Sequence, residues 1–350
     1  MKQLRIPSLV IRTASILIVT LAAVVVLTLL APVSLPQKGV VFYVRPGISR
    51  ENLVLELSRS GYIRMLPIFD VYTRARAVVP MSGEYQFKKG STPYSIWKQI
   101  TTGTGRYYRE FTIIPGWSFK DVKNAMQNEP TLKHMTTNMS NTDLMAALGD
   151  PSHAPEGMFM PETYYYSRDD ADLVILKRAH DLMALKLKDA WQTRAKNLPY
   201  ETPYQALIAA SLIEKEAYLS KEQTIISGVL VNRLHKDMLL QFDPTVIYGL
   251  GDAYQGKIHK KDLTMDTPYN TYTRKGLTPT PIAMPGLNAI RAAMHPDTHS
   301  YLYFVAKGDG SHEFNNTLAS HHDAVKKAAT FRDGQITAPP AAQGVPHATR

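Results

Sequence analysis

The stretch ALIAASLIEKEAYLSKEQ, residues 206–223, is an apolar run that contains two glutamates, Glu214 and Glu216. Alanine, leucine and isoleucine without proline or glycine predict that most of this stretch is a helix. A carboxylate in apolar surroundings is costly unless it is paired or used. Because the acids that cleave glycosidic bonds are carboxyl groups with a raised pKa, the stretch points to an enzyme that acts on a sugar polymer.

A helical wheel indicates that the two glutamates do not form a pair. At about 100° per residue, one face collects the apolar residues Ala206, Ala209, Ala210, Ile213 and Ala217. Glu214 and Glu216 fall on the two flanks of this face. Residues two apart on a helix do not face each other, so at most one glutamate faces a given cleft. The wheel does not decide which one, and it also allows EKE to be the solvated end of an amphipathic helix.

The N-terminus predicts a membrane anchor. Residues 14–31 form an uncharged apolar run, close to the ~20 residues that span a bilayer. Pro32 and Val33 follow and make a poor cleavage site, which favours an uncleaved anchor over a signal peptide. Basic residues precede the run, so we expect residues 1–13 in the cytoplasm and the remaining chain on the other side of the inner membrane, in the periplasm.

Composition narrows the class of protein. The 350 residues have room for two domains, carry a formal net charge of +10 and include no cysteine. Disulfides and thiolate chemistry are therefore excluded, which suits an oxidising compartment. The basic charge favours anionic partners or a membrane surface, but it is scattered. With the predicted topology, this argues against a nucleic-acid partner.

After a predicted linker at residues 32–40, a small module is expected over residues 41–105. Three segments share a glycine, one residue and then a hydroxyl residue that opens a helix, at residues 42–57, 88–100 and 111–126. The expected helix N-caps are Ser49, Thr92 and Ser118. GEYQF, residues 83–87, is a further candidate strand. A strand that leads through a turn into a capped helix resembles a LysM-like module, a small sugar-binding fold.

The rest of the chain is expected to be richer in helix. An amphipathic pattern predicts a long helix over residues 169–194, and another is expected over residues 221–235. Residues 238–285 are dense in proline, glycine, threonine and tyrosine and predict loops. Aromatic alternation predicts a strand at residues 301–308, and the Pro/Ala-rich residues 336–350 predict a disordered tail.

Several long motifs, in order along the chain, resemble the endolytic murein transglycosylase, or YceG-like, family of bacteria. They are EGMFMPETYYY (156–166), ASLIEKEA (210–217), VNRL (231–234), QFDPTVIYGLG (241–251), TPYNTY (267–272), HPDTHSYLYFVA (295–306) and HEFNNTLASH (312–321). The resemblance implies an α+β chain: one transmembrane helix, the LysM-like module, and a mixed, helix-rich YceG-like catalytic domain over residues 106–335.

The resemblance also implies a reaction and a catalytic residue. The family cleaves the β-1,4 bond between N-acetylmuramic acid and N-acetylglucosamine without water, and it leaves a 1,6-anhydro end on the muramic acid. Its essential acid is the second glutamate of the E-K-E motif, which is Glu216 here. Implied partners are peptidoglycan glycan strands, the cell membrane and penicillin-binding peptidoglycan synthases. A role in ending nascent strands is the further hypothesis.

Other side chains are predicted to contact the substrate, because aromatic rings stack on sugars while amides and hydroxyls pair with the ring substituents. They are Glu162, Asp243, Tyr269, Asn270, Tyr272, Asn315, Ser320 and His321. The histidines do not have zinc spacing and are interpreted as structural or surface residues. No cofactor or metal is expected. A hydrolase that uses water and a non-catalytic glycan-binding scaffold remain as alternatives.

Overall fold

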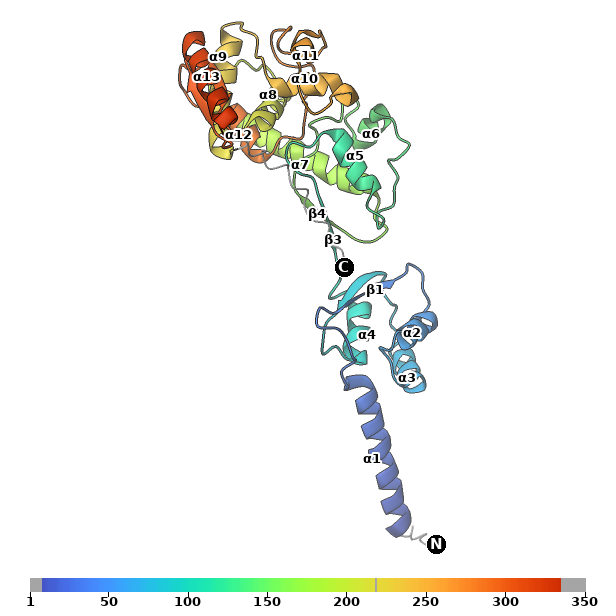
Figure 1. Ribbon diagram of the computed structural model, residues 1–350. Helices are drawn as coiled ribbons and strands as arrows, with labels where there is room; N and C mark the ends of the chain where they lie inside the picture. Colours follow the sequence, from blue (N-terminus) through green and yellow to red (C-terminus); the bar gives the residue numbers. More distant parts are fainter. Residues whose placement is uncertain (1–7, 218, 335–350) are drawn as a thin grey trace. The chain divides into compact units, whose positions relative to one another are not determined.

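A computed structural model describes residues 8–217 and 219–334 (Figure 1). The chain divides into two compact units. The first contains the chain up to Glu110 together with residues 165–170. The second contains residues 111–164 and the chain from Ala171 onward. The predicted tail at residues 336–350 lies outside the described residues.

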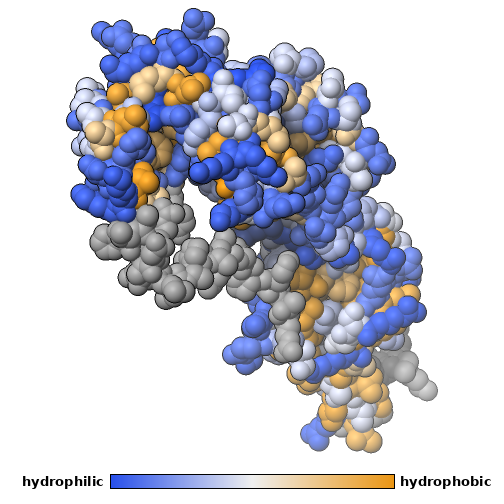
Figure 2. All heavy atoms as spheres, turned by 45° about the horizontal axis from the view of Figure 1, so that its top comes forward, coloured by the Kyte–Doolittle hydropathy of each residue, from blue (hydrophilic) through white to orange (hydrophobic). Residues whose placement is uncertain are grey.

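The N-terminal helix α1 (Ser8–Leu30) contains a candidate membrane span, Arg12–Leu30. Its large apolar side chains are mostly exposed; Ile16, Leu17 and Val19 are each about two-thirds or more exposed. Figure 2 shows apolar surface, in orange, gathered over this helix. The predicted anchor at residues 14–31 agrees with the span Arg12–Leu30 to within two residues at the N-terminal end and one residue at the C-terminal end.

The first unit contains a two-stranded antiparallel sheet and three short helices besides α1. In chain order its elements are β1 (Val40–Val44), α2 (Arg50–Arg59), α3 (Leu66–Arg76), β2 (Gly83–Phe87) and α4 (Pro93–Thr102). Strand β1 pairs with β2, with Phe42 opposite Tyr85. Between the sheet and the helices lies a core that includes the fully buried Phe69 and Phe87. The strand predicted at GEYQF is confirmed as β2.

The three predicted N-caps are confirmed. Ser49, Thr92 and Ser118 each accept a hydrogen bond from the backbone N–H three residues further on, at 3.1–3.2 Å. Such caps satisfy N–H groups that the first turn leaves free, and each typically stabilises a helix by about 1 kcal/mol. The LysM-like resemblance itself stays a prediction.

The second unit is mainly helical. Two strands, β3 (Arg109–Thr112) and β4 (Thr163–Tyr166), pair with each other. The other elements are α5 (Phe119–Gln127), α6 (Asn141–Leu148), α7 (Asp172–Gln192), α8 (Pro203–Glu216), the 3₁₀ turn η1 (Ser220–Glu222), α9 (Gln223–His235), α10 (Asp243–Leu250), the 3₁₀ turn η2 (Gly251–Ala253), α11 (Lys260–Thr264), α12 (Leu287–Met294), β5 (Tyr303–Ala306), β6 (His312–Asn315) and α13 (Leu318–Gly334).

Helix α8 is the centre of this unit. It packs against α7, α9, α10 and α12 (Figure 1). Every residue from Ala206 to Ile213 is buried, so the helix is enclosed on all sides rather than on the single face that the wheel indicated. The one polar residue of this run, Ser211, is satisfied: its hydroxyl donates to the carbonyl of Ile208 and accepts from the N–H of Ile282.

Some predicted boundaries were wrong. The long helix α7 begins at Asp172 rather than at residue 169, because Asp169 has a positive φ of 67° that a helix does not allow. The segment 238–285, predicted as loops, contains the helices α10 and α11. Each is eight residues or shorter, which is too short for a clear helical periodicity in the sequence. The strand predicted at 301–308 is confirmed over the shorter range of β5.

Gly228 in α9 is required by close packing rather than by backbone conformation. A Cβ atom there would lie 2.4 Å from the carbonyl oxygen of Asp297 and 2.4 Å from Nε2 of His299.

Replacing an interior helix glycine by alanine normally stabilises a helix. In Gly228→Ala, we expect the close contacts to cause a strain of about 2 kcal/mol. This strain should lower the midpoint of thermal unfolding by about 5 °C. The exposed control Lys188→Ala in α7 should leave the midpoint unchanged. An unchanged or higher midpoint for Gly228→Ala would show that the loop yields freely.

Candidate active site

A cleft of about 560 Å³ lies in the second unit, at the C-terminal end of α8. Its walls come from the last residue of α8, from α9 and the segment that follows it, from the start of α10, from the β5–β6 hairpin and from the start of α13. Segments far apart in the sequence thus meet here. Aromatic rings contribute much of the lining, through Phe242, Tyr272, Tyr303 and Phe304.

Glu216, the last residue of α8, lies half-buried in this cleft. Burial raises the pKa of its carboxyl to about 8, and the negative charge of Asp243 acts in the same direction. The positive charge of Arg233 opposes them but does not cancel them. At neutral pH the carboxyl is therefore mostly protonated and can donate a proton.

Glu214 has a different environment. Its Oε2 accepts a hydrogen bond of 3.0 Å from the backbone N–H of Gly286. The neighbouring Lys215 donates to the carbonyl of Gly116 at 3.1 Å. The two glutamates therefore do not share a site, as the wheel indicated, and the contact of Glu214 joins α8 to the loop before α12.

Arg233 organises one wall of the cleft, and the sequence did not single it out. It is buried, with 6% of its surface exposed. Its guanidinium donates to the carbonyls of Leu302 at 2.6 Å, Leu240 at 2.7 Å and Leu239 at 3.0 Å. Burial lowers the pKa of its guanidinium below the usual range, although an arginine remains a cation at neutral pH. The arginine thus ties α9 to the segment before α10 and to the segment before β5.

Asp243 and Tyr272 meet in the cleft, as part of a cluster that fixes the start of α10. The hydroxyl of Tyr272 donates to Oδ1 of Asp243. Burial, together with this carboxylate, raises the pKa of Tyr272 well above its usual range. Beside them, Thr271 accepts from the N–H of Phe242 at 3.0 Å. Asp243 is the first residue of α10.

The histidines gather around the β5–β6 hairpin. His312 bonds through Nδ1 to Oε2 of Glu222, at 2.7 Å. The ring of His321 stacks on Tyr303, with 5.3 Å between ring centroids. Burial, and then the nearby Arg233, lower the pKa of His321, which keeps it neutral at pH 7. His312, His321 and His322 all line the cleft.

Four predicted site residues therefore line one cleft: Glu216, Asp243, Tyr272 and His321. Other predicted site residues make contacts outside this cleft. The amide of Asn270 is buried and donates to the carbonyls of Leu263 and Met265. Ser320 is exposed in the first turn of α13. It bonds to Thr317, which stands just before that helix. Asn315 is buried at the end of β6, opposite Tyr303 in the hairpin, and does not line the cleft.

One predicted residue, Tyr269, lies near a different buried carboxyl, that of Glu156. Tyr269 lines a second cavity, where its hydroxyl bonds to Thr280 at 3.0 Å. In the motif EGMFMPETYYY, Glu162 is exposed. The buried carboxyl of that motif is instead Glu156, which accepts from the N–H of Phe119 at 3.0 Å and from Tyr248 at 3.1 Å. Burial raises the pKa of Glu156 to about 7.

Comparisons with known proteins agree with this architecture. The sequence profile of the YceG-like family matches residues 42–327. An endolytic murein transglycosylase of Bacillus subtilis is 30% identical over 323 residues, which are 85% of this chain and 87% of that protein. One of Streptococcus pneumoniae is 26% identical over 301 residues, 75% of this chain and 54% of that protein, so this chain spans about half the length of the pneumococcal relative. The crystal structure of a yceG-like protein from Listeria monocytogenes has a TM-score of 0.54 and 25% identity, and the match covers 82% of this chain and 99% of that one.

The raised pKa of Glu216 makes a prediction about stability. The ordinary pKa of a glutamate is 4.5, and folding raises the pKa of Glu216 to about 8. Between these two pH values, the unfolded chain releases a proton that the folded chain keeps. Raising the pH through this range therefore favours unfolding. We expect Glu216→Gln to raise the midpoint of thermal unfolding clearly at pH 9 and by less at pH 5.

The measurement is differential scanning calorimetry of the full chain in detergent at both pH values. Glu201→Gln, an exposed change just before α8, is the matched control. Its unfolding midpoint should equal that of the unchanged protein at both pH values. If Glu216→Gln destabilises the protein at pH 9, then the carboxylate is held by favourable contacts and the assigned direction of the pKa shift is wrong.

Proposed function

The chain belongs to the YceG-like family, and from this premise we propose that it is an endolytic murein lytic transglycosylase whose catalytic residue is Glu216. The observation that carries the proposal is one carboxyl with a pKa near 8 in a cleft lined by aromatic rings. A lytic transglycosylase needs one group that first donates and then accepts a proton. The names of the Bacillus and Streptococcus relatives support the same activity.

The proposed reaction uses Glu216 twice. Its carboxyl gives a proton to the glycosidic oxygen between N-acetylmuramic acid and N-acetylglucosamine, and the bond from C1 to that oxygen breaks. The C6 hydroxyl oxygen of the muramic acid forms a new bond to C1. Its proton passes to the Glu216 carboxylate, which restores the acid. Because the nucleophile belongs to the substrate, a second catalytic carboxylate is not needed, in contrast to most glycosidases.

Neighbouring groups have supporting roles in this proposal. Asp243 helps to keep Glu216 protonated, since a nearby negative charge disfavours a second one. The cationic Arg233 stabilises the carboxylate that forms after proton donation. Tyr272, Tyr303 and Phe304 offer ring faces on which sugar rings can stack. Neutral His321 supplies a ring nitrogen as a hydrogen-bonding group for the substrate.

We further propose that the chain is anchored in the inner membrane by α1, with its N-terminus in the cytoplasm and both units in the periplasm. The support is the apolar span Arg12–Leu30 and the basic residues on its N-terminal side. Such an anchor restricts cleavage to strands near the membrane, where new strands are made. Penicillin-binding synthases are the partners that this location favours, and termination of nascent strands is the proposed role.

Product analysis tests the reaction. The full chain in detergent is incubated with purified murein, and the fragments are examined by mass spectrometry. We expect fragments with 1,6-anhydromuramic ends. Glu216→Gln should lower the rate by about 10²–10⁴-fold, since it removes the proton donor but keeps the shape of the side chain.

Glu214→Gln is the matched control. It should retain most activity, because its amide oxygen can still accept from the N–H of Gly286. Reducing ends in place of anhydro ends would identify a hydrolase instead. Equal and complete absence of products from the unchanged chain and from Glu216→Gln would indicate a glycan-binding protein.

The pH profile tests the role of Asp243. Activity of the unchanged chain should fall above pH 8, as Glu216 loses its proton. In Asp243→Asn, loss of the negative charge should move this alkaline limb to lower pH, while the bond from Tyr272 can be kept. The measurement is kcat/KM on murein strands from pH 5 to 10, with the exposed change Asp181→Asn as control. An unmoved limb would show that Asp243 does not act on Glu216.

A further inference from the structure

Large apolar side chains are exposed along one segment of the first unit, residues 65–79, which contains α3 and the residues that follow it. They are Met65, Val71, Val78 and Val79. Val71 is 68% exposed, whereas Phe69, on the opposite face of α3, is fully buried in the core of the unit. Exposed apolar side chains that gather in one place mark a surface that contacts another body. The segment 65–79 is therefore a candidate interaction surface.

The segment lies beside the end of α1, the proposed membrane span. Helix α1 packs against α3 and α4 (Figure 1). Leu29, in the last turn of α1, packs against the core of the first unit. The guanidinium of Arg64, just before α3, donates to the carbonyl of Pro32, just after α1, at 3.3 Å. Helix α3 is therefore held at the level where the span ends.

Positive charge lies at the same end of the unit. The turn that carries Lys88 and Lys89 is joined to the chain after α1, because the N–H of Val33 donates to the carbonyl of Ser91 at 2.9 Å. Lys88, Lys89 and Arg64 are exposed, and none of them forms an ion pair within residues 8–217 and 219–334. Basic side chains next to exposed apolar ones are typical of segments that lie on a surface of anionic phospholipid.

We propose that the segment 65–79 docks on the surface of the bilayer that α1 crosses. In this arrangement its apolar side chains lie between the phospholipid headgroups, while Arg64, Lys88 and Lys89 bind anionic phosphates. The inference rests on the proposed membrane anchor and adds a second contact to it. Two contacts with one bilayer fix the tilt of the span, which a single helix leaves free.

A lipid surface fits this segment better than a glycan or a protein partner does. The surface of α1 remains apolar up to its end, where Leu27 and Leu30 are each more than half exposed. Because α3 packs against this part of α1, the same lipid that covers α1 reaches α3. A glycan or a protein would have to displace that lipid, and a neutral glycan would leave the three basic side chains without a counter-charge.

Site-specific labels test the contact, and a chain without cysteine allows them. Val71→Cys in the full chain is labelled with a nitrobenzoxadiazole fluorophore in nanodiscs of phosphatidylglycerol and phosphatidylcholine. Nitroxide on the lipid headgroups quenches a label in the bilayer surface, and iodide quenches a label in water. We expect the Val71 label to be quenched by the nitroxide and protected from iodide. Leu55→Cys, at an exposed position of α2, is the matched control and should show the reverse.

A third label separates this inference from the proposed anchor. Leu21→Cys lies within the span and should be protected from iodide. If the Leu21 label is protected while the Val71 label is open to iodide, the surface contact fails and the anchor stands. If iodide reaches both labels, the anchor fails as well. Protection of Val71 that appears only when murein strands are added would identify a glycan as the partner and would overturn the proposal.

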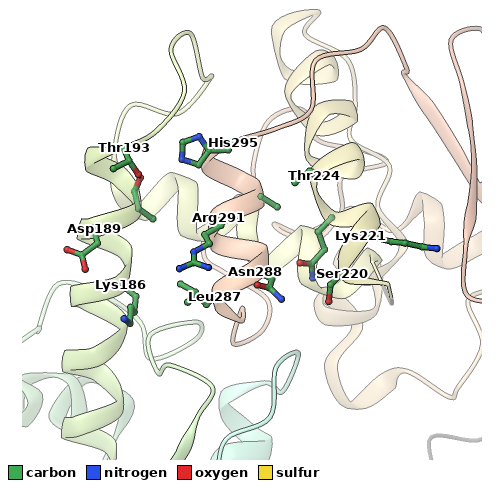
Figure 3. Close-up of a pocket in the computed structure, with 13 residues that line it drawn as sticks. Lys186, Asp189, Thr193, Ser220, Lys221, Thr224, Leu287, Asn288, Arg291 and His295 are labelled. Carbon is green, nitrogen blue, oxygen red and sulfur yellow. The ribbon is translucent and has the colours of Figure 1, made fainter.

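Charge variants test the basic residues. Lys88→Gln together with Lys89→Gln should weaken docking of the Val71 label on anionic nanodiscs by about fivefold for each charge removed. The matched control removes two positive charges from the second unit, Lys186→Gln with Arg291→Gln, at a separate cavity of about 710 Å³ (Figure 3). It should leave docking unchanged. An equal effect of both pairs, or equal docking on phosphatidylcholine alone, would overturn the role assigned to the phosphates.

Discussion

The burial of α8 from Ala206 to Ile213 is the constraint on which the rest of the second unit depends. A helix that is apolar on every side must be covered on every side, and α7, α9, α10 and α12 provide that cover. The helix can carry charge only where the cover ends, and its last turn is where Glu214 and Glu216 stand. One of them is used to hold the loop before α12. The other, Glu216, lies in a cleft, and its carboxyl has a pKa near 8.

The buried guanidinium of Arg233 is the second determinant, because its N–H groups must find acceptors. They find carbonyls in the segment that leads to α10 and in the segment that leads to β5. These two segments lead directly to Asp243 and Tyr303, which line the same cleft. A single desolvated cation thus positions two walls and also contributes a positive charge near Glu216.

The beginning of α9 stands between two cavities with different chemistry. Glu222 is engaged by His312 on the side of the cleft. Gln223, the next residue, lines a separate cavity of about 710 Å³. Adjacent residues on a helix point in directions about 100° apart, so one short segment can serve two sites.

The sequence by itself determined the elements with strong local signals: the apolar N-terminal span, the three capped helices, the strand at residues 83–87, and the separation of the two glutamates on a helix. These depend on neighbours in the chain, which the sequence displays. It also contained motifs whose resemblance to a family selected Glu216, which the helical wheel could not do. It did not reveal that α8 is enclosed on all sides, that Arg233 shapes the cleft, or that Glu156 rather than Glu162 is the buried carboxyl of its motif. Only the tertiary structure decided these points, because burial and charge at a residue depend on groups that lie tens of residues away in the chain and meet only in the folded protein.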